Sequence, residues 1–380
     1  MNPMTMKSTV LAIIISGALG FRAETGGLSE ETLDCRQNLP LPMIQNLTTS
    51  NSFVPNSTNS WWSSSYVHAS NNHDYLIVSQ CLLMSAGLYR GSILDITDPS
   101  FYRQFERFAT APFNDPSQSS GGILNITFEQ YGFHTTHDDY PLQELRTWSA
   151  VEGVEFDIRF HLSTPVILNG GTGLFQWGSE LTHEWSMPAG LTFGSFVVNG
   201  SRLTVDPTRS MTWYDRQLMW PSTLAKAANK ANWTWFELHL DDNNNNNAPA
   251  GRADKLSIWA WDTTDHRRIQ FATVRHGPGI HQVLPVTVFA PSRRTWTSSV
   301  SKATYPLDWV VTLWDGTTLS ISSVRPDQEL CDSMGLSPTY EGYIRVNGFD
   351  GDGRMIYGYG LVEQVPVGFL PAMTPSSDEG

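Results

Sequence analysis

The fold is decided by the stretch Leu203–Gln217, LTVDPTRSMTWYDRQ. It ends with an indole, a phenol, a carboxylate and a guanidinium on four successive residues, Trp213 to Arg216. Successive side chains of a strand point to opposite faces, so Trp213 and Asp215 should share one face, and Tyr214 and Arg216 the other. A charged pair among indoles is either a structural ion pair that joins strands in the core or part of the floor of a ligand-binding site.

A second run, NWTWFELHLD, extends from Asn232 to Asp241. Its residues alternate as in a strand, with one parity carrying Trp233, Trp235 and His239 and the other carrying Phe236, Leu238 and Leu240. We expect the two runs to be paired strands, so that their tryptophans face one another.

The rest of the chain is a series of short alternating or apolar segments separated by Gly, Pro, Asn and Asp clusters. This pattern indicates an all-β protein built as a sandwich or a barrel. The one helical stretch that we expect is short, at Ser222–Ala231. The polar run Asp241–Gly251 is interpreted as a hairpin loop, with a domain linker as the alternative. Asp350–Gly353, DGDG, is interpreted as a hairpin turn; it also resembles a fragment of a calcium loop, but the later ligands are missing.

Composition restricts the partners. The net charge of the 380 residues is −13 and no basic run occurs, which argues against nucleic acid or an anionic membrane surface as a partner. Residues 1–23 have a charged start and a short apolar run typical of a cleaved signal peptide rather than of a membrane span. We therefore expect a secreted protein or one of the secretory lumen. N-glycosylation sequons stand at Asn46, Asn56, Asn125, Asn199 and Asn232.

The chain has three cysteines, an odd number. In an oxidising compartment this favours one disulfide and one leftover thiol. Cys81 lies in an apolar segment that we expect to be a buried strand, whereas Cys35 and Cys331 lie in polar contexts. We therefore expect Cys35 and Cys331 to be paired. No cysteine or histidine spacing suggests a zinc site.

Four stretches resemble the lipocalin-like superfamily of carotenoid hydratases, kievitone hydratase and fungal (hetero-)Diels–Alderases. They are Ser60–His68 (SWWSSSYVH), Met211–Gln217 (MTWYDRQ), Trp233–Asp242 (WTWFELHLDD), and the pair Thr339–Gly348 (TYEGYIRVNG) with Gly358–Glu363 (GYGLVE). Thr339, Tyr340 and Leu361 depart from the family pattern. The resemblance implies an N-terminal β-sandwich and a C-terminal lipocalin-like β-barrel with the ligand between them. We place the two domains at residues 24–250 and 251–380.

The candidate site follows from the same stretches. We expect catalytic roles for Tyr214, Asp215, Arg216 and Gln217. The substrate-binding candidates are the aromatic and titratable residues Trp61, Trp62, Trp177, His183, Trp185, Trp213, Trp233, Trp235 and Glu341. The polar segment Gln176–Trp185 is interpreted as a loop over the mouth of the pocket, where His183 and Glu184 could serve as acid–base groups. Glu341 and Glu363 flank the last hairpin and are either acids or structural ion-pair partners.

No nucleophile elbow, phosphate loop, dinucleotide fingerprint or metal cluster is visible, so we expect an enzyme without a cofactor or metal. Its partner should be an apolar small molecule, because tryptophan walls are natural hosts for one. The high tryptophan content and the departures in the C-terminal motif favour a cofactor-independent pericyclase that acts on a terpenoid or polyketide substrate. The resemblance to the fungal group implies that its reaction is an intermolecular hetero-Diels–Alder cycloaddition. A hydratase that adds water to an alkene and a secreted carrier without catalysis are the alternatives.

Overall fold

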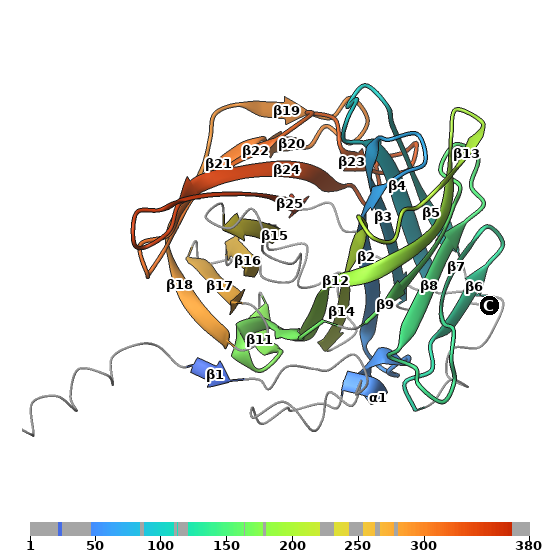
Figure 1. The fold of residues 1–380 in the computed structure, drawn as a ribbon, viewed down its shortest axis with the longest axis horizontal. Coiled ribbons are helices and arrows are strands. Elements are labelled where there is room, and N and C mark those ends of the chain that lie inside the picture. The colour runs from blue at the N-terminus through green and yellow to red at the C-terminus, as the bar shows by residue number, and fades with distance from the viewer. Residues whose placement is uncertain are drawn as a thin grey trace, which may run out of the picture.

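The computed structural model describes residues 22–24, 47–83, 87–109, 112, 121–162, 164–177, 180–220, 232–242, 254–262, 267–276 and 280–366. Most of these residues form two large antiparallel sheets that lie side by side (Figure 1). The all-β expectation is therefore confirmed. Most of the expected signal, Cys35, Asn46 and the stretch Ser222–Ala231 lie outside the described residues. No helix in the described ranges has the length and apolar character needed to cross a membrane.

The first sheet has 13 strands and folds back on itself, which produces the two layers of a sandwich. Its order is β5-β4-β3-β2-β14-β12-β9-β8-β7-β6, and β10, β11 and β13 also pair with β12. The bounds are β2 (Thr58–His68), β3 (Asp74–Leu83), β4 (Gly87–Asp95), β5 (Tyr102–Ala109), β6 (Asn125–Phe128), β7 (Tyr131–Thr135), β8 (Glu144–Ser149), β9 (Phe156–His161), β10 (Ile167–Leu168), β11 (Leu174–Trp177), β12 (Glu180–Val198), β13 (Ser201–Thr204) and β14 (Met211–Trp220). Before it lies helix α1 (Leu47–Asn51), and a 3-10 turn, η2 (Asn169–Gly171), follows β10.

The second sheet closes into an eight-stranded barrel, because β18 pairs with both β17 and β21. The barrel strands are β15 (Trp233–Asp242), β16 (Asp254–Asp262), β17 (Arg268–His276), β18 (Ile280–Pro291), β21 (Asp308–Leu313), β22 (Thr318–Ser323), β24 (Thr339–Phe349) and β25 (Met355–Val365). Two short strands extend it: β1 (Arg22–Glu24) pairs with β18, and β23 (Glu329–Leu330) pairs with β24. A separate ribbon is formed by β19 (Thr295–Thr297) and β20 (Thr304–Pro306).

The stretch between β15 and β16 is a hairpin connection, as expected, because the two strands pair antiparallel up to Leu240 and Asp254. Since β15 belongs to the barrel, the change of sheet falls between Trp220 and Trp233 rather than at the expected boundary after residue 250. For the same reason the runs Leu203–Gln217 and Asn232–Asp241, which we expected to be paired strands, do not pair with each other. β14 pairs with β2 and β12, whereas β15 pairs with β16 and β25.

Three apolar clusters hold the molecule together. One fills the sandwich, a second fills the barrel, and a third lies between the first sheet and the barrel. Strand β2 is buried along its whole length because one face packs into the sandwich and the other against the barrel. A strand with two buried faces shows no alternation of apolar and polar residues, so polarity alone could not tell its two faces apart.

The segment Gln176–Trp185, expected to be a loop, is the hairpin of β11 and β12. Its alternation was hidden because both faces of β12 are buried, with Thr182, Glu184 and Ser186 on one parity and His183 and Trp185 on the other. The polar residues of this strand are therefore interior groups, and their partners decide their role.

Cys81 is a buried residue of β3, in agreement with its expected position. The buried thiol of Cys331 lies 3.3 Å from Glu329 Oε2, and Cys35 lies outside the described residues. The pairing of Cys35 with Cys331 therefore stays a prediction. Peptide mapping without reduction should recover these two cysteines in one linked peptide pair; a disulfide that contains Cys81 would contradict the assignment.

Asn56, Asn125 and Asn199 are exposed, and Asn232 is half-buried at the start of β15. Three of the sequons thus present a side chain to which a glycan could be attached without unfolding the sheet.

Candidate active site

Strand β14 sends its two parities into different parts of the molecule. Trp213 belongs to the apolar cluster between the first sheet and the barrel, whereas Tyr214 belongs to the cluster inside the sandwich. Asp215 follows the parity of Trp213, and Arg216 follows that of Tyr214. The two charged residues therefore lie on opposite faces of the sheet, and the expected charged pair does not form.

Arg216 is fully buried inside the sandwich. Its Nε donates to Ser50 O at 2.8 Å, Nη2 donates to Ser52 O at 2.9 Å and to Asn59 Oδ1 at 2.7 Å, and Nη1 donates to two further carbonyl oxygens. Its Cζ also lies 4.3 Å from the centre of the Trp61 ring. The guanidinium thus ties the segment around α1 to β2 and β14, which is a structural role.

Other candidates share this placement. Tyr214 Oη donates to Asn51 Oδ1 at 2.7 Å, Trp61 Nε1 to Asn51 O at 2.8 Å, and Trp185 Nε1 to Ser50 Oγ at 2.9 Å. Burial and the nearby Arg216 charge lower the pKa of His183 to about 4. Five candidates therefore lie in the interior of the sandwich: Trp61, His183, Trp185, Tyr214 and Arg216. We assign them to the sandwich core rather than to a ligand-binding site.

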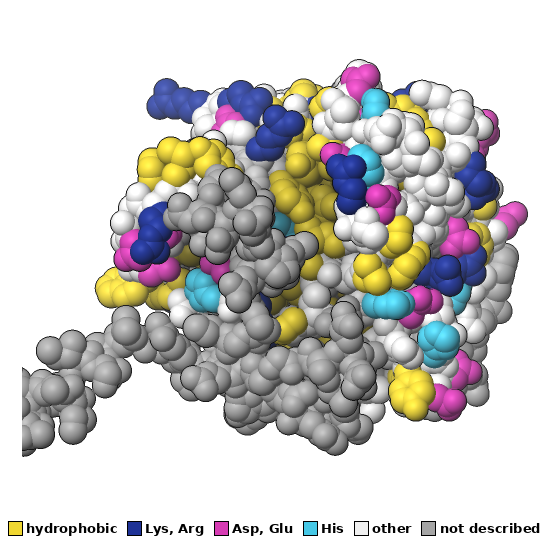
Figure 2. Space-filling model, viewed as in Figure 1, with side chains coloured by type: hydrophobic (Ala, Val, Ile, Leu, Met, Phe, Trp, Pro, Cys, Tyr) yellow, Lys and Arg dark blue, Asp and Glu magenta, His cyan; other side chains and the backbone are white. Residues whose placement is uncertain are grey.

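The remaining tryptophans meet between the two sheets. The ring centres of Trp62 and Trp235 are 5.2 Å apart, those of Trp213 and Trp235 are 6.3 Å apart, and those of Trp177 and Trp233 are 4.9 Å apart. Figure 2 shows hydrophobic side chains in the hollow between the barrel and the first sheet. Trp259 of β16 completes the wall at 6.1 Å from Trp235. Trp259 and Trp261 alternate within an apolar segment of the sequence, and this pattern could have predicted that both side chains lie on one face of a buried strand.

Two carboxyl groups face this region from the first sheet. Glu184 Oε1 accepts hydrogen bonds from Trp259 Nε1 at 3.1 Å and Asn169 Nδ2 at 2.8 Å, and Oε2 accepts one from Gln217 Nε2 at 3.4 Å. Burial and the neighbouring Asp215 hold the pKa of Glu184 well above its usual value.

Asp215 is the second of these groups. Its Oδ1 accepts a hydrogen bond from Ser186 Oγ. Burial is the main cause that raises the pKa of Asp215 to about 7, and the charge of Glu363 adds to it. A carboxyl group that titrates near neutral pH is suited to proton transfer in either direction.

Two further carboxyl groups face the region from the barrel. Glu341 and Glu363 are directly opposite each other on β24 and β25. Burial, followed by the charge of Glu363, raises the pKa of Glu341 well above its usual value. Trp62 Nε1 donates to Glu341 Oε1 at 3.3 Å, and Trp233 Nε1 donates to Glu363 Oε1 at 2.6 Å.

A narrow pocket opens among these groups. Its lining includes Arg90, Trp177, Gln217, Trp233, Trp259, Thr339 and Glu363. The free volume is about 50 Å³, which is room for one or two water molecules, so a larger ligand enters only if lining side chains move. Arg90 Nη1 donates to Thr339 Oγ1 at 2.5 Å, and Nη2 lies 3.9 Å from Glu341 Oε1. Arg90 thus brings a positive charge to the Glu341 side of the pocket.

A fifth buried carboxyl group, Glu237, lies in the same interface. Its Oε1 accepts hydrogen bonds from Ser64 Oγ and Tyr66 Oη, both at 2.5 Å. Burial raises the pKa of Glu237 to about 8. Glu237 lies within the run Asn232–Asp241, but nothing in the sequence of that run indicated that its side chain is buried rather than exposed to solvent.

The raised pKa of Glu237 makes stability depend on pH. The folded protein keeps the proton up to about pH 8, whereas the unfolded chain releases it near the ordinary glutamate pKa of 4.5. The folded state therefore binds more protons in this window, and the free energy of unfolding should fall as pH rises through it. Urea unfolding across the window should show a weaker decline for Glu237→Gln, which mimics the neutral acid, and an unchanged decline for the exposed control Glu129→Gln. An equally steep decline in Glu237→Gln would contradict the assignment.

Within the described ranges, no three His, Cys, Asp or Glu side chains come together in a way that could hold a metal ion. The polar groups that face the pocket are therefore carboxyl, amide, hydroxyl and guanidinium groups of the chain itself.

The family model described as AttH-like matches residues 91–364, which include most of both sheets and all four pocket-side carboxyl residues. The chain belongs to the AttH-like family. Its resemblance to the lipocalin-like superfamily is thereby confirmed.

Two curated members of this group are similar over most of the chain. Kievitone hydratase of Fusarium solani subsp. phaseoli is 33% identical over 313 residues, which cover 80% of this chain and 82% of that protein. Dehydratase asqC of Emericella nidulans is 29% identical over 375 residues, which cover 95% of this chain and 99% of that protein.

Two solved structures agree with the fold. The crystal structure of kievitone hydratase from Nectria haematococca has a TM-score of 0.73 at 34% identity and covers 86% of this chain and 94% of its own. The crystal structure of CghA with Sch210972 has a TM-score of 0.52 at 8% identity and covers 92% of this chain and 99% of its own. At that identity the second likeness shows the fold alone. The sandwich and the lipocalin-like barrel are thus the architecture of this chain.

Proposed function

We propose that this protein is an enzyme that adds water to a carbon–carbon double bond of a largely apolar small molecule, or forms such a double bond by removing water from the corresponding alcohol. One observation carries the proposal: four carboxyl groups gather where the first sheet meets the barrel, with Glu184 and Asp215 on the first sheet and Glu341 and Glu363 on the barrel. Glu363 also lines a pocket together with Trp177, Trp233 and Trp259. The names of the two curated relatives, a hydratase and a dehydratase, support it.

The chemistry needs one acid and one base. In dehydration, an acid protonates the leaving hydroxyl group while the C–O bond breaks, and a base removes a proton from the adjacent carbon as the double bond forms. Hydration is the reverse: the alkene carbon gains a proton and water loses one as its oxygen bonds to the neighbouring carbon. Both reactions leave the protein unchanged and require no redox partner.

The structure suggests how the roles are divided. Glu184 is buried, its pKa is held well above the usual value, and its Oε2 accepts a hydrogen bond from pocket-lining Gln217, so it is our candidate for the acid in dehydration. Glu363 is half-buried, lines the pocket and accepts a hydrogen bond from Trp233 Nε1. It is our candidate for the base, with Glu341 behind it.

The hetero-Diels–Alder cycloaddition expected from the sequence remains the second candidate, because the walls of Trp62, Trp213 and Trp235 could pose two reactants without proton transfer. It gives no role to four adjacent carboxyl groups, three of which have raised pKa values. Hydration or dehydration uses them, and for that reason it is preferred.

The test is incubation of the purified protein with terpenoid and polyketide alkenes, and with the corresponding alcohols, in water enriched in oxygen-18. Heavy oxygen in an alcohol product, or an alkene formed from the alcohol, supports the proposal. An unlabelled adduct of two reactants supports cycloaddition instead. Binding of the substrates without any product would identify a carrier and overturn both enzymatic functions.

A further inference from the structure

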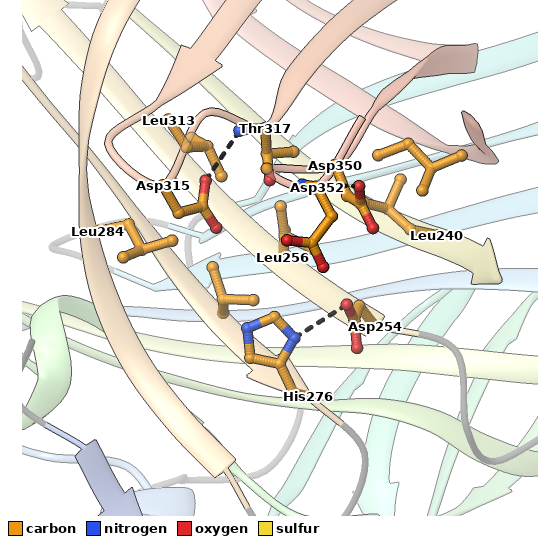
Figure 3. Close-up of a pocket in the computed structure, with 13 residues that line it drawn as sticks. Leu240, Asp254, Leu256, His276, Leu284, Leu313, Asp315, Thr317, Asp350 and Asp352 are labelled. Atoms are coloured by element: carbon orange, nitrogen blue, oxygen red, sulfur yellow. Dashed lines mark hydrogen bonds and ion pairs between the residues drawn. The ribbon is translucent and has the colours of Figure 1, made fainter. Parts of the chain in front are cut away.

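The barrel has a second, larger cavity at one of its ends (Figure 3). Its free volume is about 440 Å³, which lies within the range of small-molecule pockets. It is lined by residues of the barrel and of its hairpin turns, and it shares no lining residue with the tryptophan pocket. Ligand binding here would therefore be separate from the proposed reaction.

The floor of this cavity is aliphatic. Six barrel strands contribute one apolar side chain each, and these are Leu240, Leu256, Val274, Leu284, Leu313 and Ile356. Five of them belong to the barrel core, and Ile356 packs against it. Among the described residues that line the cavity there is no Phe, Tyr or Trp, and the one ring is the imidazole of His276 at the rim, so the floor suits an unbranched hydrocarbon chain better than a polar ring system.

The rim is acidic. Asp254, Asp315, Asp350 and Asp352 surround the mouth, and Figure 3 shows their carboxylates gathered above the aliphatic floor. Two basic side chains lie beside them: His276, whose Nδ1 lies 2.9 Å from Asp254 Oδ2, and Arg354, whose Nη1 lies 3.1 Å from Asp352 Oδ2. Among the described residues of the mouth, four carboxylates therefore outnumber these two basic groups, and their net charge is negative.

The carboxylates are held in this arrangement by the backbone. The turn between β24 and β25 packs on the turn between β21 and β22, and a Cβ atom at Gly351 would lie 2.2 Å from Asp315 O. Only glycine allows this approach. The DGDG motif is a hairpin turn, as expected from the sequence, in which Gly353 N donates to Asp350 O at 2.9 Å. Its acidic side chains are thus fixed beside Asp315 at the entrance to an apolar cavity.

We propose that this end of the barrel binds an aliphatic ammonium compound, with the hydrocarbon chain against the leucine-rich floor and the cationic head among the rim carboxylates. We infer a cationic head group from charge complementarity, because an anionic amphiphile such as a fatty acid would bring a like charge to the rim and be repelled. We infer a hydrocarbon tail from the aliphatic floor, because burial of apolar surface there is favourable.

The experiment compares octylammonium, octanoate and 1-octanol as titrants of the full chain in a calorimeter, at neutral pH and low salt. The three probes have the same tail, so differences in affinity report the head group. We expect saturable one-to-one binding of octylammonium, at least tenfold weaker binding of octanoate, and weaker binding of octylammonium when salt screens the rim.

Two double variants locate the site. Asp315→Asn with Asp352→Asn removes two exposed rim charges and keeps the side-chain shape, and it should weaken octylammonium binding by about fivefold. The matched control is Asp138→Asn with Asp139→Asn, two exposed charges of the first sheet, which should change nothing. Glu363→Gln should also leave the affinity unchanged, because it alters only the tryptophan pocket.

Octanoate that binds as tightly as octylammonium, an unchanged affinity in the rim variant, or no saturable binding would each overturn the proposal. Loss of octylammonium binding in Glu363→Gln would assign the amine to the tryptophan pocket instead and overturn it as well. None of these outcomes depends on whether the protein hydrates, dehydrates or joins its substrate.

Discussion

Replacing Glu184 by Gln should lower the turnover of hydration or dehydration by about a hundredfold or more, the usual contribution of a required acid or base. The amide keeps the Oε1 acceptor that binds Trp259 Nε1 and Asn169 Nδ2, but it has no proton to transfer. Burial holds the pKa of the native carboxyl group well above its usual value, so its replacement by a neutral side chain of the same shape should leave folding intact. The measurement is the steady-state rate with the substrate identified by the heavy-oxygen experiment.

The exposed Glu129→Gln serves as the matched control and should keep full activity. Glu363→Gln should cause a loss similar to that of Glu184→Gln, and the double variant should be little worse than either single one, since residues that act as a unit are not additive. If both single variants retain turnover while a folded Trp235→Ala variant loses it, then proton transfer does not limit the reaction. Positioning of the reactants by the tryptophan side chains, as in a cycloaddition, would then explain the activity better.

Replacing Arg216 by Met should lower the free energy of unfolding by about 3–5 kcal/mol, because it leaves several buried oxygen acceptors without a donor. Those acceptors include Ser50 O, Ser52 O and Asn59 Oδ1. Urea unfolding measures the loss. Arg216→Lys should fall between Met and the native residue, because an ammonium has fewer donors and a different geometry.

The control for this prediction is Arg202→Met, since Arg202 is exposed and makes one hydrogen bond, to Ser195 Oγ. Its effect should be within about 0.5 kcal/mol. If Arg216→Met were as stable as the native protein but inactive, the structural role assigned to Arg216 would be wrong and its expected catalytic role would be restored.

The sequence alone determined the architecture and the parity of its strands. Alternation in Trp233–Asp242 and the turn at Asp350–Gly353 are local properties of the chain, and both appear in the structure. The grouping of Trp213 with Asp215, apart from Tyr214 and Arg216, also followed from the geometry of a single strand. Such features depend on neighbouring residues, so a linear reading can reach them.

The sequence did not show which parity faces the pocket. Strands β2 and β12 are buried on both faces, one against the sandwich core and one against the barrel, so polar residues occur on both parities. From the sequence, Arg216 and Asp215 were equally good candidates to face the pocket. Their roles differ only because the segment around α1 packs against the face that carries Arg216 and the barrel packs against the face that carries Asp215.

The tertiary structure alone decided the site and its chemistry. Glu184 and Glu363 come from different sheets, and their pocket exists only because the barrel docks on β2, β12 and β14. The raised pKa of Glu184 has the same origin, since it arises from burial and from Asp215 rather than from any adjacent residue in the chain. Desolvation depends on everything that surrounds a group in space, which is why the strand pattern could be read from the sequence and the proton-transfer groups could not.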